Sequence, residues 1–126
     1  MKLIELYNAE KIYDKFSSRT DLPIKTTYKV LKFFEVVEKE ANFYRDEIIK
    51  ILNQYAERDD EGKIIATDGG QNIKIKEDCI AECEQKMQEL ANLEVDKPSV
   101  TFTLDELPDG LTVQELSYLM PFIEEE

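Results

Sequence analysis

The chain of 126 residues contains no histidine and no tryptophan, and it has only four glycines, four prolines and two cysteines. Without histidine there is no imidazole to serve as a general base, to activate a serine or cysteine nucleophile, or to ligate a metal. The low glycine and proline content, with 42% hydrophobic residues, argues against disorder and favours a folded protein with a modest core. We expect one domain over residues 1–126.

Long apolar runs are absent as well. No stretch reaches the roughly 18 apolar residues that a membrane-spanning helix needs, and the first residues lack the apolar core of a signal peptide. The sequence therefore predicts a cytoplasmic protein without a membrane partner.

The two cysteines, Cys79 and Cys83, are four residues apart in a helical pattern. Their side chains would leave one helix face side by side, which is poor geometry for a disulfide, so we expect reduced thiols. Two thiols without imidazole do not complete a four-ligand zinc site. The sequence thus predicts no metal and no cofactor.

Two helical patterns occupy the first half of the chain. Residues 1–16 carry apolar side chains at three- and four-residue spacing, which predicts an N-terminal helix. After a polar loop that ends at Pro23, a longer pattern predicts one helix over residues 24–58. Its apolar stripe consists of Val30, Phe34, Val37, Ala41, Tyr44, Ile48, Ile51 and Tyr55. A second apolar set, which includes Leu52, widens this stripe, so we expect several neighbours for the helix and self-association of the chain as a homo-oligomer.

The middle of the chain predicts a β-hairpin over residues 62–76. Two short β-prone runs surround the turn Asp68-Gly69-Gly70, and Ile73 and Ile75 alternate with lysines, which gives the hairpin one apolar face. Residues 77–94 return to helical spacing. We expect this second helix to run antiparallel along the long one.

The last segment, residues 99–126, predicts a strand followed by a short C-terminal helix. Residues 99–103 alternate in the manner of an extended strand that joins the hairpin, and Thr112 and Glu115 have the spacing of a capping box at the start of the helix. The predicted fold class is α+β. It combines a long helix and an antiparallel partner helix, linked by a β-hairpin, with a small antiparallel sheet and short terminal helices.

Charge is distributed unevenly along the chain. The net charge is −12, but residues 1–58 carry 11 basic and 10 acidic groups, whereas residues 59–126 carry 5 basic and 18 acidic groups. Such an excess of negative charge opposes phosphate, so no direct nucleic-acid binding is expected. The acidic half presents a negative field to a basic protein surface, or it serves only to keep the protein soluble. The candidate partner-binding residues are Glu77, Glu84, Asp105, Glu106 and Asp109.

One segment has a pattern known from enzymes. Glu61 and Lys63, preceded by Asp60, have the Glu-x-Lys spacing with which many metal-dependent nucleases place a carboxylate ligand beside a lysine. The same residues also form an ordinary polar helix end that leads into a hairpin, and an acidic protein repels DNA. We therefore expect no enzymatic activity and no catalytic residues, with a nuclease-like enzyme as the least favoured alternative.

The order of the segments resembles a family of small acidic proteins of unknown function encoded by phages and prophages of Gram-positive bacteria. The matching residues are Leu6-Tyr7-Asn8-Ala9, Leu22-Pro23-Ile24-Lys25, Tyr28-Lys29-Val30, the segment from Tyr55 to Lys63, Phe102-Thr103-Leu104-Asp105-Glu106-Leu107, and the segment from Leu116 to Glu125. The resemblance covers nearly the whole chain and implies a phage origin. It implies no catalytic residues.

Together these features predict a non-enzymatic phage accessory protein that acts by binding protein. If the protein is a minor virion or assembly protein, its partner is a virion component. If it is a host-directed factor, its partner is a host protein. The alternative is an acidic inhibitor of a bacterial defence complex, such as an anti-CRISPR or other anti-defence protein that mimics DNA. Either role places the protein in the bacterial host cytoplasm or on the virion.

Overall fold

The structure is a computed structural model that describes residues 1–70 and 72–124, without the side chain of Asp68. Its α-helices and strands are α1 (Leu3–Glu10), α2 (Tyr13–Ser17), α3 (Ile24–Tyr55), β1 (Ala66–Thr67), β2 (Asn72–Ile73), α4 (Ile80–Ala91) and α5 (Val113–Leu119). Single 3-10 turns are η1 (Asp68–Gly70), η2 (Glu77–Cys79), η3 (Leu104–Glu106) and η4 (Met120–Phe122).

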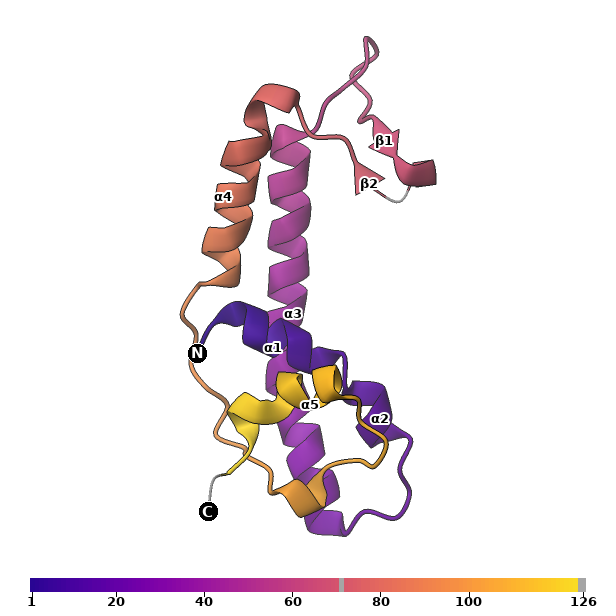
Figure 1. Cartoon of the computed structure of the whole chain (residues 1–126), viewed down its shortest axis with the longest axis vertical. Coiled ribbons are helices and arrows are strands. Elements are labelled where there is room, and N and C mark those ends of the chain that lie inside the picture. The colour runs from indigo at the N-terminus through magenta and orange to yellow at the C-terminus, as the bar shows by residue number, and fades with distance from the viewer. Residues whose placement is uncertain (71, 125–126) are drawn as a thin grey trace.

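The 32-residue helix α3 is the axis of the molecule (Figure 1). Helices α1, α2 and α5 gather around its first half, α4 runs antiparallel beside its second half, and the β1–β2 arm projects beyond its end. The predicted α+β class is confirmed, with a long helix, a small antiparallel sheet and short helices.

The end of α3 is determined by the chain that returns from the arm. At Ala56 the backbone becomes extended, with φ −65° and ψ 138°. The N–H of Lys76 then donates to the carbonyl of Tyr55 at 3.0 Å, and the N–H of Glu57 donates to the carbonyl of Lys74 at 2.8 Å. The first bond satisfies a carbonyl that the helix end leaves open, and both bonds hold the chain beyond Tyr55 against the returning segment. Helix α3 therefore stops three residues before the predicted end at residue 58.

The arm is a two-stranded antiparallel hairpin in which Ala66 pairs with Ile73 and Thr67 with Asn72. Its turn uses the backbone freedom of glycine, because Gly69 has φ 69° and Gly70 has φ 93°, values that side-chain-bearing residues rarely adopt. The hairpin predicted from the glycine turn is therefore present, although its regular strands are short.

The prediction of a third strand at residues 99–103 is wrong. Phe102 forms an isolated parallel bridge with Ile123 instead, at the opposite end of α3 from the arm. The N–H of Phe102 donates to the carbonyl of Phe122 at 2.9 Å, and the N–H of Glu124 donates to the carbonyl of Phe102 at 2.8 Å. The alternating pattern correctly predicts extended backbone, but burial of the Phe102 ring decides where the segment lies.

The single helix predicted over residues 1–16 is also wrong, because a tight turn divides it into α1 and α2. The N–H groups of Lys11 and Ile12 donate to carbonyls three residues back, Asn8 and Ala9, in place of the four-residue helical step. Ile12, in the turn, and Phe16 are both buried in the core, with exposed fractions of 0% and 1%.

Phenylalanine rings form the centre of the core. Phe33 of α3 is fully buried, and its ring centre lies 5.0 Å from that of Phe34, 5.1 Å from Phe102 and 4.8 Å from Phe122. Phe16 of α2 closes the cluster, with its ring centre 5.4 Å from that of Phe102. Edge-to-face and tilted pairs of this kind stabilise a core beyond the area that they bury.

We expect Phe33→Ala to lower the free energy of unfolding by about 3–5 kcal/mol, because the substitution leaves a cavity among three rings. Phe43→Ala is the matched control on the same helix, since the Phe43 side chain is 44% exposed, and it should cost less than about 1 kcal/mol. Urea denaturation followed by circular dichroism measures both. Equal losses would contradict the assignment of Phe33 to the centre of the core.

Candidate functional site

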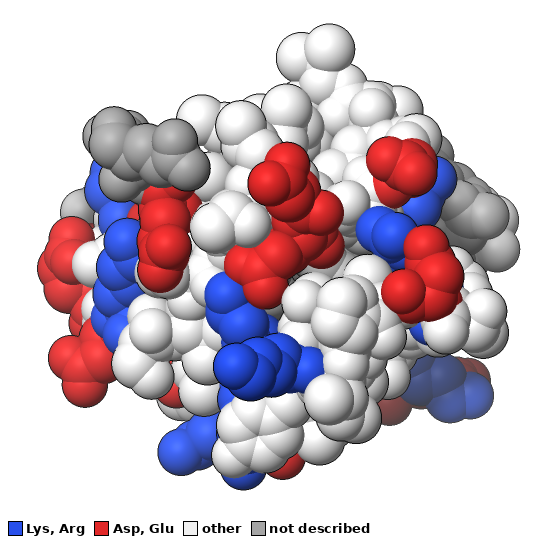
Figure 2. Space-filling view, turned by 90° about the horizontal axis from the view of Figure 1, so that it is seen from below, with Lys and Arg blue, Asp and Glu red and all other residues white. Residues whose placement is uncertain are grey.

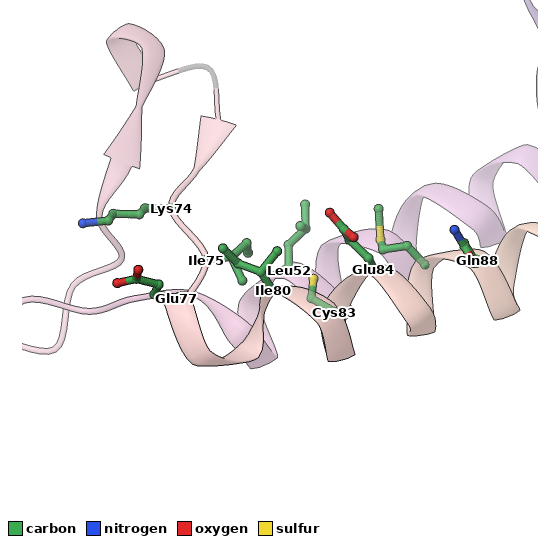
Figure 3. Close-up of a pocket in the computed structure, with 9 residues that line it drawn as sticks. Leu52, Lys74, Ile75, Glu77, Ile80, Cys83, Glu84 and Gln88 are labelled. Atoms are coloured by element: carbon green, nitrogen blue, oxygen red, sulfur yellow. The ribbon is translucent and has the colours of Figure 1, made fainter.

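A groove with apolar walls lies where α3, α4 and the segment after β2 meet. Its volume is about 710 Å³. The walls are Leu52, Ile75, Ile80, Cys83 and Met87, and the rim is Lys74, Glu77, Glu84 and Gln88. Figure 3 shows Leu52, Ile75 and Ile80 gathered at the centre, with Lys74 and Glu77 at one end and Gln88 at the other. We call this site the apolar groove.

The apolar groove exists because the second half of α3 has a helix on one side and solvent on the other. Two helices that lie side by side bury the residues between them and leave their flanks open. Cys83 points between the helices and is 5% exposed, whereas Ile80 on the flank is 44% exposed. The apolar groove is thus a flank of the α3–α4 pair that no other described element covers.

Two carboxylates on the rim have no cationic partner among the described residues. Neither Glu77 nor Glu84 forms an ion pair there, and both side chains are exposed. The lysine of the rim is already neutralised, because Lys74 Nζ lies 3.1 Å from Glu57 Oε2. The rim therefore surrounds apolar walls with net negative charge.

The thiols near the groove are packing groups. Cys79 and Cys83 are both free. Burial raises the pKa of the Cys83 thiol, and the neighbouring Glu84 raises it further. Burial also raises the pKa of Cys79, with a second contribution from Asp78. Both thiols are therefore protonated at neutral pH, a state in which cysteine is a poor nucleophile.

The five predicted partner-binding residues do not share one surface. Glu77 and Glu84 lie on the rim of the apolar groove. Asp105, Glu106 and Asp109 lie in and after η3, which is at the opposite end of α3 (Figure 1). A helix of this length spans about 48 Å, so the two groups cannot contact the same small partner segment.

Glu106 has partners inside the protein. Its Oε1 accepts from Lys29 Nζ at 2.6 Å and from the N–H of Thr103 at 2.9 Å, and its Oε2 accepts from Thr26 Oγ1 at 3.3 Å. Burial alone would raise the pKa of Glu106, but the hydrogen bonds from Lys29 and Thr103 outweigh it and leave the pKa below its usual value. Glu106 fastens η3 to the start of α3.

Asp105 and Asp109 are exposed, but they do not lie in a uniformly negative region. Asp109 is close enough to Arg19 to contribute to its raised pKa, whose main cause is a hydrogen bond to Asp21. Figure 2 shows this end of the molecule, where acidic and basic side chains are intermixed.

The segment with the nuclease-like spacing forms a closed turn. Asp59 Oδ1 accepts from the N–H groups of Glu61 and Lys63, at 2.9 Å each. The side chains of Glu61 and Lys63 are each 76% exposed and lie 3.6 Å apart. No cluster of three or more potential metal ligands occurs among the described residues, and within the same residues no helix has the length and apolar character to cross a membrane.

Comparison of the sequence with protein-family models gives no match, and neither curated proteins nor solved structures match it. The resemblance to small acidic phage proteins therefore stays a prediction.

The sequence predicts the elements that carry the groove residues, but it does not predict that these residues line one groove. The sequence predicts that residues 77–94, which include Ile80, Cys83 and Met87, form a helix along the long one, and that Ile75 lies on the apolar face of the hairpin. The signal for an open flank was the second apolar set on α3, to which Leu52 belongs. How deeply each side chain is buried depends on how α3 and α4 are rotated against each other, and helical spacing does not determine that rotation.

We expect Glu106→Gln to lower the free energy of unfolding by about 1–3 kcal/mol at pH 7, because the charged hydrogen bonds to Lys29 and Thr103 are weakened. The folded-state pKa of Glu106 lies below its unfolded value, so its contribution is complete above the unfolded pKa and is lost as the pH falls through the folded pKa. The difference between wild type and variant should therefore shrink below about pH 4.5.

Urea denaturation at a series of pH values measures this difference. Asp105→Asn, the exposed neighbour, serves as the control and should leave stability nearly unchanged. A gap between wild type and Glu106→Gln that stayed constant down to pH 3 would contradict the role of the charged carboxylate.

Proposed function

We propose that this protein is a non-enzymatic accessory protein that acts by binding another protein, and that the apolar groove is its contact surface. The observation that carries the proposal is the open apolar wall beside two carboxylates, Glu77 and Glu84, that form no ion pair with any described residue. Protein interfaces combine an apolar centre with a polar rim in this way. A wall of this kind is costly to leave in water unless a partner covers it.

The chemistry of the groove defines the partner segment. Apolar side chains of the partner would pack against Ile80 and Met87, and lysines or arginines beside them would face Glu77 and Glu84. We therefore propose a segment of a second protein that carries apolar anchors with basic flanks. A groove of about 710 Å³ accommodates a few such side chains.

The setting that we propose is a bacterial host infected by a phage, as the resemblance implies. The protein would act in the host cytoplasm or be carried on the virion. As a minor virion or assembly protein it would bind a virion component, and as a host-directed factor it would bind a host protein.

A second candidate function is inhibition of a bacterial defence complex by the acidic half of the chain. The observation that favours it is the row of exposed carboxylates along η2 and α4: Glu77, Asp78, Glu82, Glu84 and Glu89. The basic residue within this segment, Lys86, lies with its Nζ 5.5 Å from the centre of the Tyr55 ring. A surface rich in carboxylates is able to compete with DNA for a basic surface.

Affinity capture with groove variants tests the proposal. Lysate of infected Gram-positive cells is passed over four tagged proteins: wild type, Ile80→Asp, Glu84→Lys and Glu89→Lys. The retained proteins are identified by mass spectrometry. Glu89→Lys is the matched control, because Glu89 is an exposed carboxylate on the same helix outside the groove. We expect Ile80→Asp and Glu84→Lys to retain at least about tenfold less of the partner than wild type or Glu89→Lys.

The identity of the partner and the salt dependence separate the two candidates. A virion or host protein that needs Ile80 and Glu84 but not Glu89 supports the groove. A defence subunit that is lost equally with Glu84→Lys and Glu89→Lys, and released between about 0.1 and 0.5 M salt, supports the acidic surface instead. Identical retention by all four proteins contradicts both.

A further inference from the structure

The hydrogen bonds of residues 72–76 leave one edge of this extended segment open. The N–H of Lys74 donates to the carbonyl of Ile65 at 2.9 Å, and the carbonyl of Lys74 accepts from Glu57 at 2.8 Å. The N–H of Lys76 donates to the carbonyl of Tyr55 at 3.0 Å. All of these bonds lie on one side of the segment, because main-chain groups of alternate residues in a strand point to the same side.

The residue between them, Ile75, points its main-chain groups to the other side. Neither its N–H nor its carbonyl has a hydrogen-bond partner among the described residues. Ile75 pairs with Ala56 only as a bridge whose bonds are made by the flanking residues. The open edge of residues 73–75 is thus a row of main-chain groups of the kind that accepts an additional strand.

The open edge adjoins the apolar groove, since the side chain of Ile75 is one of the groove walls. Figure 3 shows Ile75 beside Ile80 and Leu52, with the extended segment leading into α4. A peptide that hydrogen-bonds to this edge is extended, so every second side chain points the same way. Those side chains reach the groove walls, and the alternate ones remain in solvent.

We infer that the apolar groove binds its partner as an added β-strand, which pairs with the main chain at Ile75 and places alternate apolar side chains against Ile80 and Leu52. The inference rests on the proposed function and adds how the partner is recognised. Main-chain hydrogen bonds supply affinity, and side-chain pockets supply specificity, in this mode of recognition. The carboxylates of Glu77 and Glu84, on the groove rim, select basic residues that lie on the same face of the added strand as the apolar ones.

Three synthetic peptides test the inference, each labelled for fluorescence anisotropy. The first, the alternating peptide, has serine at every second position, and its groove-facing positions are valines at the centre and lysines at both ends. The second has the same composition arranged with helical periodicity, and the third is the alternating peptide with every second amide N-methylated. We expect the alternating peptide to bind at least about tenfold more tightly than the other two, because it alone presents an extended row of donors and acceptors. Hydrogen exchange should also slow at the amide of Ile75 when this peptide binds.

A matched protein variant separates the groove from general charge attraction. Glu84→Lys should weaken the alternating peptide about tenfold, while Glu89→Lys should change its affinity less than about twofold.

Different failures overturn different claims. The inference that the partner binds as an added strand is wrong if the helical peptide binds the groove as tightly as the alternating one, or if N-methylation has no effect. The proposed function stands in either case. If no peptide distinguishes Glu84→Lys from Glu89→Lys, the groove is not the binding surface and the proposed function fails with it. If the chain dimerises without peptide and dimerisation alone protects the Ile75 amide, the open edge pairs with a second copy and the inference is overturned.

Discussion

Packing of aromatic rings around Phe33 is the constraint on which the rest of the structure depends. Phe16 comes from the N-terminal region, Phe102 and Phe122 come from the C-terminal region, and all three converge on the first half of α3. Rings that bury this much apolar area dominate a small core. Residues from the N-terminal and C-terminal regions therefore pack together against the first half of α3.

That concentration leaves the second half of α3 with less cover. Helix α4 packs there and buries Cys83, but the flank with Leu52, Ile80 and Met87 stays open, and the short arm adds Ile75 to the same wall. The aromatic core therefore lies at one end of the molecule, and a two-helix layer with an open flank lies at the other. The proposed binding surface follows from this arrangement and not from any reactive group.

Much of the fold could be predicted from sequence, because it depends on local patterns. The stripe from Val30 to Tyr55 predicted α3, and the Asp68-Gly69-Gly70 turn predicted the arm. Less of the candidate site could be predicted. Glu106 was grouped with Glu77 and Glu84 because all are acidic, yet Glu106 pairs with Lys29, 77 residues away. Charge pattern along the chain does not reveal which carboxylate meets a lysine.

The amino-acid sequence by itself determined the elements of this protein and the sign of its charge, because helical spacing, glycine turns and composition act over a few residues or over the whole chain. Tertiary structure alone decided that Phe102 packs against Phe33 and not beside the hairpin, and that Glu106 pairs with Lys29. It also decided that, among the described residues, the main chain of Ile75 is left without a partner beside the apolar groove. These features arise from contacts between residues far apart in the chain, where burial and hydrogen bonding compete and local preference is overruled.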